Sequence, residues 1–572
     1  MEQGFSPALR LRVLRLQPLR YLTDTLAIRQ LAMPSNSSPE ETFLALLKSG
    51  LPQALPRFLT GQRWFGGKAR TIRSAEILDI VPFFSGTLRS YFILAQVEYT
   101  SGPADTYDIP LVLAHDGTSL KDSSCVRVSA GSSDEIVLGD ALTNEQFLNQ
   151  LLEAIAEGLS VPGGRGRVRA VGTAALRSLW QPSRGPLVPS VMNREQSNSS
   201  VVYENRLVLK MFRRLEQGLN PDLEIGAFLI AKTSFRNVPP LAGYLEYLNG
   251  AGTSAALAML QGYVANQGDA WQYTLKALAE YYENAPRWNL GANDLPDATL
   301  LELCGEAIPD QARQRIGPYL DAAALLGRRT GELHLALASV PGDPEFAPQP
   351  FTAPDRQALA NSAIQLLTAN FALLRRLRNE LPDQARDDAG QVLQLEEIAR
   401  RRFQRLAGLR GSAMVTRIHG DYHLGQVLFT GSDFVIIDFE GEPARPLEER
   451  RKKRSPLQDV AGMLRSFHYA AYAPLLQQES GERPPREELR AWANRAQYWQ
   501  RWVSAAFLKA YLEVSENSIV IPQDREELAL LLDLYLLDKA IYELGYELNN
   551  RPAWVRIPMD GIAQLLQPAI SN

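Results

Sequence analysis

Apolar and polar positions follow two different periods along the chain. Between residues 72 and 140, short runs alternate apolar with polar side chains and are separated by Gly, Ser, Pro and Asp, which predicts β-strands. Strand patterns return at 168–175 and 200–213. From residue 221 onward apolar residues favour helices, interrupted by short strand patterns near 256–264, 427–429 and 433–437. We therefore expect a β-rich N-terminal part and a mostly helical C-terminal part.

A polar cluster interrupts the helical part. Its sequence is RIHGDYHLGQVLF, residues 417–429, in which Asp421 precedes Gln426 by five positions. Two apolar runs around the turn TGSD then predict a hairpin, and Asp438 follows its second strand. Because a hairpin returns the chain to its start, we expect Asp421, Gln426 and Asp438 to converge. Two carboxylates and an amide oxygen suit Mg²⁺, and phosphoryl transfer needs such groups to orient the attacking hydroxyl and hold the metal.

Two of the five histidines of the chain, His419 and His423, lie in this motif. For His423 two roles stay open: it caps a helix or braces the loop, or it contacts a ligand. A zinc site is not expected, because no third nitrogen or sulfur ligand lies at a suitable spacing.

A kinase also needs a lysine for the nucleotide phosphates and an acidic partner for that lysine. The segment VVYENRLVLKMF reads as a hairpin around Glu-Asn, with Lys210 near the end of its second strand. Glu224 follows in a predicted helix that is capped by Asn220 and has Pro221 in its first turn. Lys210 is thus expected to bind the α- and β-phosphates, held by an ion pair with Glu224.

No G-x-G-x-x-G motif precedes this lysine. The segment QSNSS, residues 196–200, occupies the expected place, and small polar side chains with backbone N–H groups can cradle phosphate. Its candidate phosphate-binding residues are Ser197, Asn198, Ser199 and Ser200. Further along, a predicted strand leads into a helix after Gly268, where a hinge between two lobes is expected. The candidate adenine-binding residues there are Gln261, Tyr263 and Val264.

Length, net charge, apolar runs and cysteine count limit the classes of protein to which the chain can belong. A chain of 572 residues is too long for one ordinary core and predicts two to four structural units. A net charge of −4 argues against nucleic acid as a partner. No membrane helix is expected, because Asp533 and Asp538 break the longest apolar run. Two cysteines do not make a disulfide framework, which fits a reducing cytosol and a cytoplasmic location.

Several separated stretches, in order, resemble the maltokinases, ATP-dependent enzymes of the aminoglycoside-phosphotransferase-like, protein-kinase-like superfamily. The resemblance covers about residues 40 to 568. The stretches that carry it are RWFGGKAR (63–70), NPDLEIGAFL, GRRTGELHLAL (327–337), HGDYHLGQVL, IIDFEGEPARP, RSPLQDVAGMLRSFHYAA and YELGYELNNRPAWVRIP. One departure is Tyr422, which stands where the family pattern has Leu and is expected to face away from the chemistry.

The resemblance implies an α+β, bilobal protein-kinase-like fold, with a β-rich N-terminal cap subdomain and N-lobe and a mostly helical C-lobe. The expected divisions are a poorly ordered extension, a cap subdomain, an N-lobe and a C-lobe, at residues 1–38, 39–140, 141–265 and 266–572.

The resemblance also implies the reaction, in which ATP phosphorylates maltose to maltose 1-phosphate for α-glucan (glycogen) synthesis from trehalose. Asp421 would orient the anomeric hydroxyl or accept its proton, and His419 would brace the catalytic loop. Gln426 and Asp438 would bind Mg²⁺, and Glu440 is either a further metal ligand or a cap. Asp459 is expected to hold the catalytic-loop backbone from a buried helix. Association with trehalose synthase is a further expectation, since the family also occurs fused to that enzyme.

The sugar site is expected on the segment 538–554, in which candidate residues lie at helical spacings. Aromatic faces, carboxylates and amides suit the ring faces and hydroxyls of a disaccharide. The candidate residues are Lys539, Tyr542, Glu543 and Tyr546, at spacings that share one helix face, together with Arg551 and with His423 of the catalytic loop. An alternative stays open, in which Tyr542 and Tyr546 belong to a core stripe.

Two other functions stay open at this point. The first keeps the fold and changes the acceptor to glucosamine, an aminoglycoside or another small alcohol, for which more carboxylates would be expected at the site. The second is a catalytically inactive nucleotide-binding module, against which the joint presence of Lys210, Asp421, Gln426 and Asp438 argues.

Overall fold

The computed structural model describes residues 39–85, 87–114, 125–129, 135–192, 198–288, 290–291, 294–409, 411–478 and 486–566. The chain divides into two compact units. The N-terminal unit comprises the residues up to Asn220 and Leu241–Tyr263, and the C-terminal unit comprises Pro221–Pro240 and the chain from Val264 onward. Residues 1–38, expected to be a poorly ordered extension, lie outside the described ranges.

The first sheet of the N-terminal unit has the strand order β1-β2-β3-β5-β4, and β11 pairs with β3. Helix α1 (Pro39–Gly61) packs against it through Leu47, Leu51 and Leu55, which lie at helical spacing on one face and are fully buried. The strands are β1 (Ile72–Ser85), β2 (Leu88–Tyr99), β3 (Asp105–Leu113), β4 (Cys125–Ser129), β5 (Glu135–Asp140) and β11 (Arg214–Leu215).

The second sheet of this unit has the order β6-β7-β12-β13-β10-β9-β8. The predicted hairpin around Glu204 and Asn205 is confirmed, because both residues have positive φ, as a type I′ turn between β9 and β10 requires. The strands are β6 (Ser160–Pro162), β7 (Gly166–Gly172), β8 (Pro189–Met192), β9 (Asn198–Tyr203), β10 (Leu207–Phe212), β12 (Leu241–Asn249) and β13 (Ser254–Gly262).

Two helices complete the N-terminal unit. Helix α2 (Glu145–Glu157) is capped by Asn144, whose side chain accepts a hydrogen bond from the backbone N–H of Phe147. Its residues Phe147, Leu151 and Ile155 enter a hydrophobic core that includes side chains from both sheets. Helix α3 (Ala174–Leu179) follows β7.

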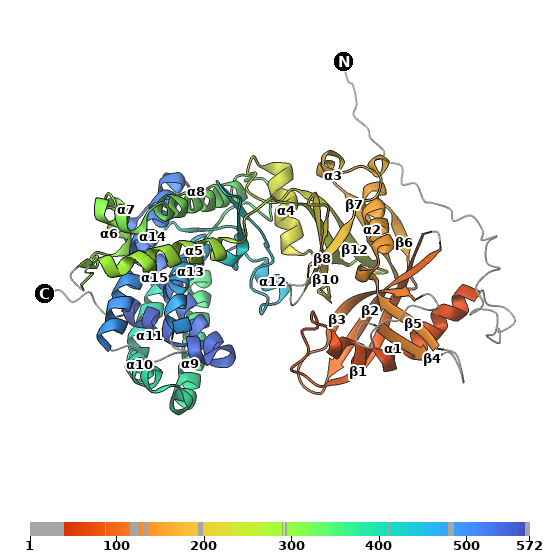
Figure 1. Ribbon diagram of the computed structural model, residues 1–572, viewed down its shortest axis with the longest axis horizontal. Coiled ribbons are helices and arrows are strands. Elements are labelled where there is room, and N and C mark those ends of the chain that lie inside the picture. Colours follow the sequence, from red (N-terminus) through yellow and green to blue (C-terminus); the bar gives the residue numbers. More distant parts are fainter. Residues whose placement is uncertain are drawn as a thin grey trace, which may run out of the picture. The chain divides into compact units, whose positions relative to one another are not determined.

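The C-terminal unit is mostly helical, as the sequence predicts. Helix α13 packs against both α14 and α15 (Figure 1). Its helices are α4 (Pro221–Lys232), α5 (Ala270–Asn284), α6 (Leu300–Gly305), α7 (Asp310–Ile316), α8 (Tyr319–Leu337), α9 (Ala353–Leu377), α10 (Asp383–Leu393), α11 (Glu396–Ala407), α12 (Leu447–Arg450), α13 (Leu457–Gln478), α14 (Arg486–Ser515), α15 (Arg525–Asn550) and α16 (Arg556–Leu566).

Short strands of the C-terminal unit position the chemistry. The predicted hairpin after the catalytic motif is confirmed as β16 (Val427–Phe429) paired with β17 (Phe434–Ile436). A second small pair joins β14 (Gln349–Pro350) to β15 (Met414–Val415), just before the motif. Of the helices that the structure describes, none has the length and apolar character needed to cross a membrane.

Candidate active site

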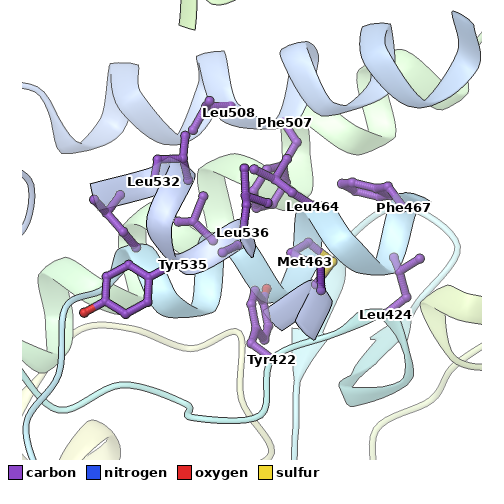
Figure 2. Close-up of a cluster of buried hydrophobic side chains, with 14 of the residues drawn as sticks. Tyr422, Leu424, Met463, Leu464, Phe467, Phe507, Leu508, Leu532, Tyr535 and Leu536 are labelled. Atoms are coloured by element: carbon purple, nitrogen blue, oxygen red, sulfur yellow. The ribbon is translucent and has the colours of Figure 1, made fainter. Parts of the chain in front are cut away.

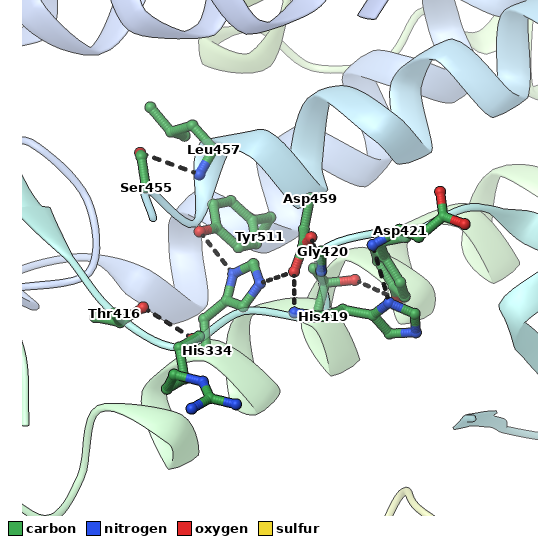
Figure 3. Close-up of polar contacts among 12 residues, drawn as sticks. His334, Thr416, His419, Gly420, Asp421, Ser455, Leu457, Asp459 and Tyr511 are labelled. Carbon is green, nitrogen blue, oxygen red and sulfur yellow. Dashed lines mark hydrogen bonds and ion pairs between the residues drawn. The ribbon is translucent and has the colours of Figure 1, made fainter. Parts of the chain in front are cut away.

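The backbone of the catalytic loop is held by the buried carboxylate of Asp459 on α13. His419 and Gly420 donate their backbone N–H groups to its two oxygens, at 2.7 and 2.9 Å (Figure 3). His334 of α8 lies 3.1 Å from the same carboxylate, and its other ring nitrogen lies 3.1 Å from the Tyr511 hydroxyl. Asp459 therefore holds the loop in the way that the sequence suggested.

The charge of Asp459 is stabilised by these partners. Burial alone would raise its pKa, but the hydrogen bond and charge of His334, the charge of His419 and the Gly420 N–H outweigh burial and hold that pKa below its usual value. The carboxylate thus stays ionised and accepts hydrogen bonds, so the loop geometry depends on a charged group in a buried place.

His419 joins the loop that carries Asp421 to the segment 437–440, which we call the metal loop after its proposed role. Its Nε2 lies 2.9 Å from the carbonyl oxygen of Ile437, the residue before Asp438, and its Nδ1 faces the backbone N–H of Asp421 at 3.4 Å. The side chain is buried between the rings of Tyr422 and Phe439. These contacts are those of a bracing residue, the role that the resemblance implied.

Tyr422 anchors the loop in the core of the C-terminal unit. Its ring lies with Leu424 and Met463 in a hydrophobic cluster to which α13, α14 and α15 contribute side chains (Figure 2). Its hydroxyl forms a 2.9 Å hydrogen bond with Thr330 of α8. Tyr422 therefore faces the core, as expected of the position that departs from the family pattern.

His423 has a local structural contact. Its Nδ1 accepts a 3.0 Å hydrogen bond from the backbone N–H of Gly425 and caps the short helix Leu424–Gln426. Burial lowers its pKa, which favours the neutral ring that such an acceptor needs. Of the two roles left open by the sequence, the structure contains the capping contact.

Of the three side chains expected to converge, Gln426 and Asp438 meet within the C-terminal unit, whereas the convergence of Asp421 with them stays a prediction. Gln426 donates a 2.9 Å hydrogen bond to Asp438, which leaves its amide oxygen available as a ligand. Ligand oxygens of Asp438, Glu440 and Asp222 lie within 4.8 Å of one another. Asp438 has a φ of 68°, a left-handed conformation that non-glycine residues adopt at a cost and that often marks functional sites. This oxygen-only donor set fits Mg²⁺.

Asp222 is the member of this cluster that sequence reasoning missed. It lies in the first turn of α4, and its carboxylate accepts a 3.0 Å hydrogen bond from the backbone N–H of Phe439. The helix itself was predicted, but nothing local in the sequence indicates that its first turn meets the metal loop.

Asp421 lines a cavity of the C-terminal unit. Lys539 of α15 lies 3.7 Å from its carboxylate. Both line a small pocket of about 40 Å³, which shares its walls with a larger cavity of about 880 Å³. We call the two together the acceptor cavity. The polar and aromatic side chains that line both parts are Glu442, Arg445, Gln458, Tyr535, Asp538 and Tyr542.

The acceptor cavity holds mixed charge. Arg445 donates a 2.6 Å hydrogen bond to Glu442, and its charge and hydrogen bond hold the pKa of Glu442 below its usual value against the effect of burial. Asp538 differs, because burial raises its pKa to about 6 and outweighs the charges of Arg445 and Lys539. A carboxylate that is costly to ionise therefore stands beside the group expected to orient the acceptor.

The predicted sugar-binding face of α15 is only partly correct. Lys539 and Tyr542 line the acceptor cavity. Glu543 instead lies in the core, bonded to both Nε and Nη2 of Arg465 at 2.9 and 2.6 Å. Tyr546 is 46% exposed and lines neither part of the cavity. A helix turns about 100° per residue, so Glu543 is rotated by that angle from Tyr542 and meets Arg465 of α13.

Arg551 also differs from the prediction. Its guanidinium binds the buried Glu547 at 3.0 and 2.6 Å and stacks near the Trp554 ring. It therefore ends α15 rather than lining the acceptor cavity, and a carboxylate that the sequence analysis did not consider is its partner.

The candidate phosphate-binding lysine, Lys210, and the described residues of the segment before it lie in the N-terminal unit. Lys210 is on β10, paired with Ser200 of β9 and Met259 of β13. Asn198 and Ser199 begin β9 and so lie in a strand instead of a turn, and Ser199 accepts a 2.9 Å hydrogen bond from Arg213. Ser197 lies outside the described residues. Phosphate binding by this segment stays a prediction.

The candidate hinge follows β13. Gln261 is in the strand, and Tyr263 donates its backbone N–H to the carbonyl of Arg206 at 2.8 Å. Val264 is the first residue of the C-terminal unit after the strand. The connection between units thus falls where a hinge was predicted, while adenine binding there stays a prediction.

Glu224 has strong partners within the C-terminal unit. Arg417 binds it at 2.7 Å, and Arg451 binds it through Nε and Nη2 at 3.1 and 2.7 Å. Burial would raise its pKa, but these two arginines hold the pKa below its usual value. The ion pair with Lys210, which belongs to the other unit, stays a prediction.

Comparison with known proteins identifies the cap. Residues 58–143 match the family model of the maltokinase N-terminal cap domain. A glucosamine kinase of Mycolicibacterium smegmatis is 22% identical over 383 residues, covering 66% of this chain and 79% of that protein. A glucosamine kinase of Streptacidiphilus jiangxiensis is 25% identical over 388 residues, covering 66% of this chain and 73% of that protein.

Solved structures extend the similarity to the fold. A glucosamine kinase in complex with glucosamine, ADP and inorganic phosphate matches with a TM-score of 0.55 at 20% identity, covering 90% of this chain and 97% of that one. Another glucosamine kinase structure, crystal form A, gives a TM-score of 0.56 at 19% identity, covering 86% and 92%. This chain therefore carries a maltokinase-type N-terminal cap domain and has the bilobal, kinase-like fold that it shares with the glucosamine kinases.

Proposed function

We propose that the protein is an ATP-dependent sugar kinase whose acceptor is maltose, phosphorylated on the anomeric hydroxyl. The observation that carries this proposal is the position of Asp421. Its carboxylate belongs to a loop whose backbone is held by Asp459. It lines the acceptor cavity together with Lys539. The same loop continues to Gln426, which precedes the hairpin and the candidate metal-binding carboxylates. A kinase needs this arrangement of one orienting carboxylate and a separate metal set.

In the proposed reaction Asp421 orients the anomeric hydroxyl and takes its proton. The hydroxyl oxygen attacks the γ-phosphorus of ATP, the bond from that phosphorus to the β–γ bridging oxygen breaks, and ADP leaves. Mg²⁺ held by Gln426, Asp438 and Glu440 would neutralise phosphate charge. The ammonium of Lys539 keeps the Asp421 carboxylate in place by attraction from 3.7 Å.

Nucleotide use is supported by the kinase-like fold and by a relative solved with ADP and inorganic phosphate. The β9–β10 hairpin and Lys210 supply the elements that phosphate binding would need in the N-terminal unit. ATP as the donor, a supply of product to α-glucan synthesis, and association with trehalose synthase all follow from the resemblance to maltokinases.

The size of the acceptor cavity supports a disaccharide. Its larger part, about 880 Å³, is near the upper end of the range of roughly 300–1,000 Å³ for small-molecule sites. Tyr535 and Tyr542 offer aromatic faces for sugar rings, and Gln458 offers both a donor and an acceptor for hydroxyls. The maltokinase-type cap points to the same acceptor.

Glucosamine is the second candidate acceptor, and a specific observation favours it. Three carboxylates, those of Asp421, Glu442 and Asp538, line the small pocket beside which the reacting ring would lie. An ammonium group gains more from such surroundings than a hydroxyl does. Two relatives that match most of this chain are glucosamine kinases.

An acceptor panel separates the two candidates. ADP release with MgATP is measured on maltose, glucose, glucosamine and trehalose. The proposal predicts the highest kcat/KM for maltose, because binding of the second ring orients the reacting one. Trehalose should give no turnover, since both of its anomeric positions are blocked. A higher kcat/KM for glucosamine than for maltose would identify glucosamine as the acceptor. Absence of turnover on all of these sugars would contradict both candidates.

A further inference from the structure

Helix α4 carries its two first-turn acids to the loops of the C-terminal unit. The sequence places this helix in the N-lobe, yet residues Pro221–Pro240 cluster with the C-terminal unit. Glu224 binds Arg417, at the start of the catalytic motif, and Arg451, after the metal loop. The first turn of α4 is therefore fixed to the segments on either side of the metal loop, and Asp222 in that turn has a defined place.

Asp222 contacts the metal loop in two ways. Its carboxylate accepts the backbone N–H of Phe439, the residue between Asp438 and Glu440, at 3.0 Å. Ligand oxygens of all three acids also lie within 4.8 Å of one another. Asp222 thus fixes the loop that carries the two predicted ligands and adds a third carboxylate to them.

The close approach of the three carboxylates favours binding of a cation. The Asp222 side chain is only 1% exposed, and Asp438 and Glu440 are partly buried. Burying a carboxylate costs stability, and further carboxylates at this distance repel it. A divalent cation bound by these oxygens would lower the repulsion among the three carboxylates, and Mg²⁺ takes carboxylates in this way.

We propose that Asp222 is a third carboxylate of the Mg²⁺ site and that α4 is part of the metal-binding apparatus. The inference rests on the proposed kinase function and deepens it. Asp222 would contribute its negative charge to metal binding, in addition to accepting the hydrogen bond that holds Phe439.

The variant Asp222→Asn separates these two roles. An asparagine oxygen can still accept the Phe439 N–H, so the loop keeps its hydrogen bond while the site loses one charge. Mn²⁺ serves as the probe, and its free concentration is followed by electron paramagnetic resonance with saturating ADP. The proposal predicts at least tenfold weaker Mn²⁺ binding by the variant, with ADP binding in the absence of metal unchanged.

A matched control tests the effect of removing any first-turn acid. Asp310 begins α7, is exposed, and lies outside the metal cluster. The variant Asp310→Asn should bind Mn²⁺ as the unchanged protein does. Equal Mn²⁺ affinity for Asp222→Asn and the unchanged protein would overturn the inference while leaving the kinase proposal intact. Failure of the unchanged protein to bind Mn²⁺ with ADP would count against both.

A second measurement needs no variant and covers the case in which Asp222→Asn fails to fold. Fe²⁺ bound in place of Mg²⁺, with ascorbate and hydrogen peroxide, cleaves the backbone close to the metal. The inference predicts cleavage near residue 222 as well as near residue 438, suppressed by excess Mg²⁺. Cleavage confined to the segment around residue 438 would contradict it.

Discussion

The catalytic loop and the acceptor cavity meet at Asp421 but are built on different principles. Behind Asp421, buried groups pair with one another: Asp459 with two backbone N–H groups and His334, and His419 with the Ile437 carbonyl. In front of it, burial outweighs the charges of Arg445 and Lys539 at Asp538 and raises its pKa to about 6.

Because of this difference, we expect the residues that fix the reacting groups to be distinct from the residues that select the acceptor. A fully paired network holds one geometry, because losing any partner leaves a buried polar group unsatisfied. A cavity with incompletely compensated charge gains stability from a ligand that supplies the missing partners. We therefore expect changes behind Asp421 to lower turnover, and changes in front of it to alter acceptor binding.

The largest effect is expected at Asp421 itself. The variant Asp421→Asn keeps the size of the side chain and removes the proton acceptor. Turnover should fall by about 10²–10⁴-fold, the range for losing a general base. Calorimetry of ADP binding should give the affinity of the unchanged protein. Near-normal turnover in this variant would remove Asp421 from the mechanism.

The next effect is expected at Asp459, behind the loop. Replacing Asp459 by Asn removes the charge that two N–H groups and His334 share. Because displacement of a reacting group by about 1 Å can cost 10²-fold, we expect kcat to fall by roughly tenfold to a hundredfold, with the acceptor KM little changed. Steady-state kinetics with varied maltose measures both. A rise in KM at constant kcat would instead assign Asp459 to acceptor binding. It would contradict the expectation that residues behind Asp421 act on turnover.

Asp538 should show the opposite behaviour. The variant Asp538→Asn loses a charged acceptor for a sugar group, so the acceptor KM should rise about tenfold, the equivalent of a hydrogen bond to a charged group. The matched control is Glu526→Gln, an exposed acid in the first turn of the same helix. An unchanged KM in Asp538→Asn would remove this residue from the acceptor site.

The stability of the same variant tests the charge directly. Burial raises the pKa of Asp538 from 3.8 to about 6, so between these pH values the folded chain keeps a proton that the unfolded chain releases. Stability therefore falls as pH rises through this window, by at most about 3 kcal/mol. Urea denaturation should find Asp538→Asn more stable than the unchanged protein at pH 7.5. The two should converge near pH 4, and a constant difference would contradict the assignment.

The smallest effects are expected from a pair of tyrosines on α15. Tyr542 lines the acceptor cavity, whereas Tyr546, one helical turn further, is exposed outside it. Tyr542→Ala should raise the maltose KM by about fivefold, since stacking and hydrogen bonds of this kind are worth about 1 kcal/mol. Tyr546→Ala should leave it unchanged. Equal effects of the two substitutions would restore the original expectation that both contact the sugar.

The parts of the site that the sequence predicts are those set by local geometry. Gln426 and Asp438 flank one hairpin and meet across it, because a hairpin brings its ends together whatever surrounds it. The turn between β9 and β10 was visible for the same reason. The two kinds of lobe followed from the change in hydrophobic period, which does not depend on long-range contacts.

The parts that sequence reasoning missed depend on which elements meet. Helical spacing grouped Glu543 with Tyr542, but it does not show that Arg465 of α13 covers one side of α15. Asp222 and Asp538 belong to segments far from the catalytic loop along the chain. Their roles follow from tertiary packing, which spacing along one chain segment does not report.

The most direct test of the central claim is phosphorus NMR of the product formed from maltose and MgATP. Asp421 is proposed to take a proton from the anomeric hydroxyl, so the account predicts one new resonance from a phosphate on the anomeric carbon. That resonance should form at a rate at least a hundredfold lower with Asp421→Asn. A phosphate on a primary alcohol, or no sugar phosphate from maltose while glucosamine is phosphorylated, would contradict the proposed acceptor and its orientation at Asp421.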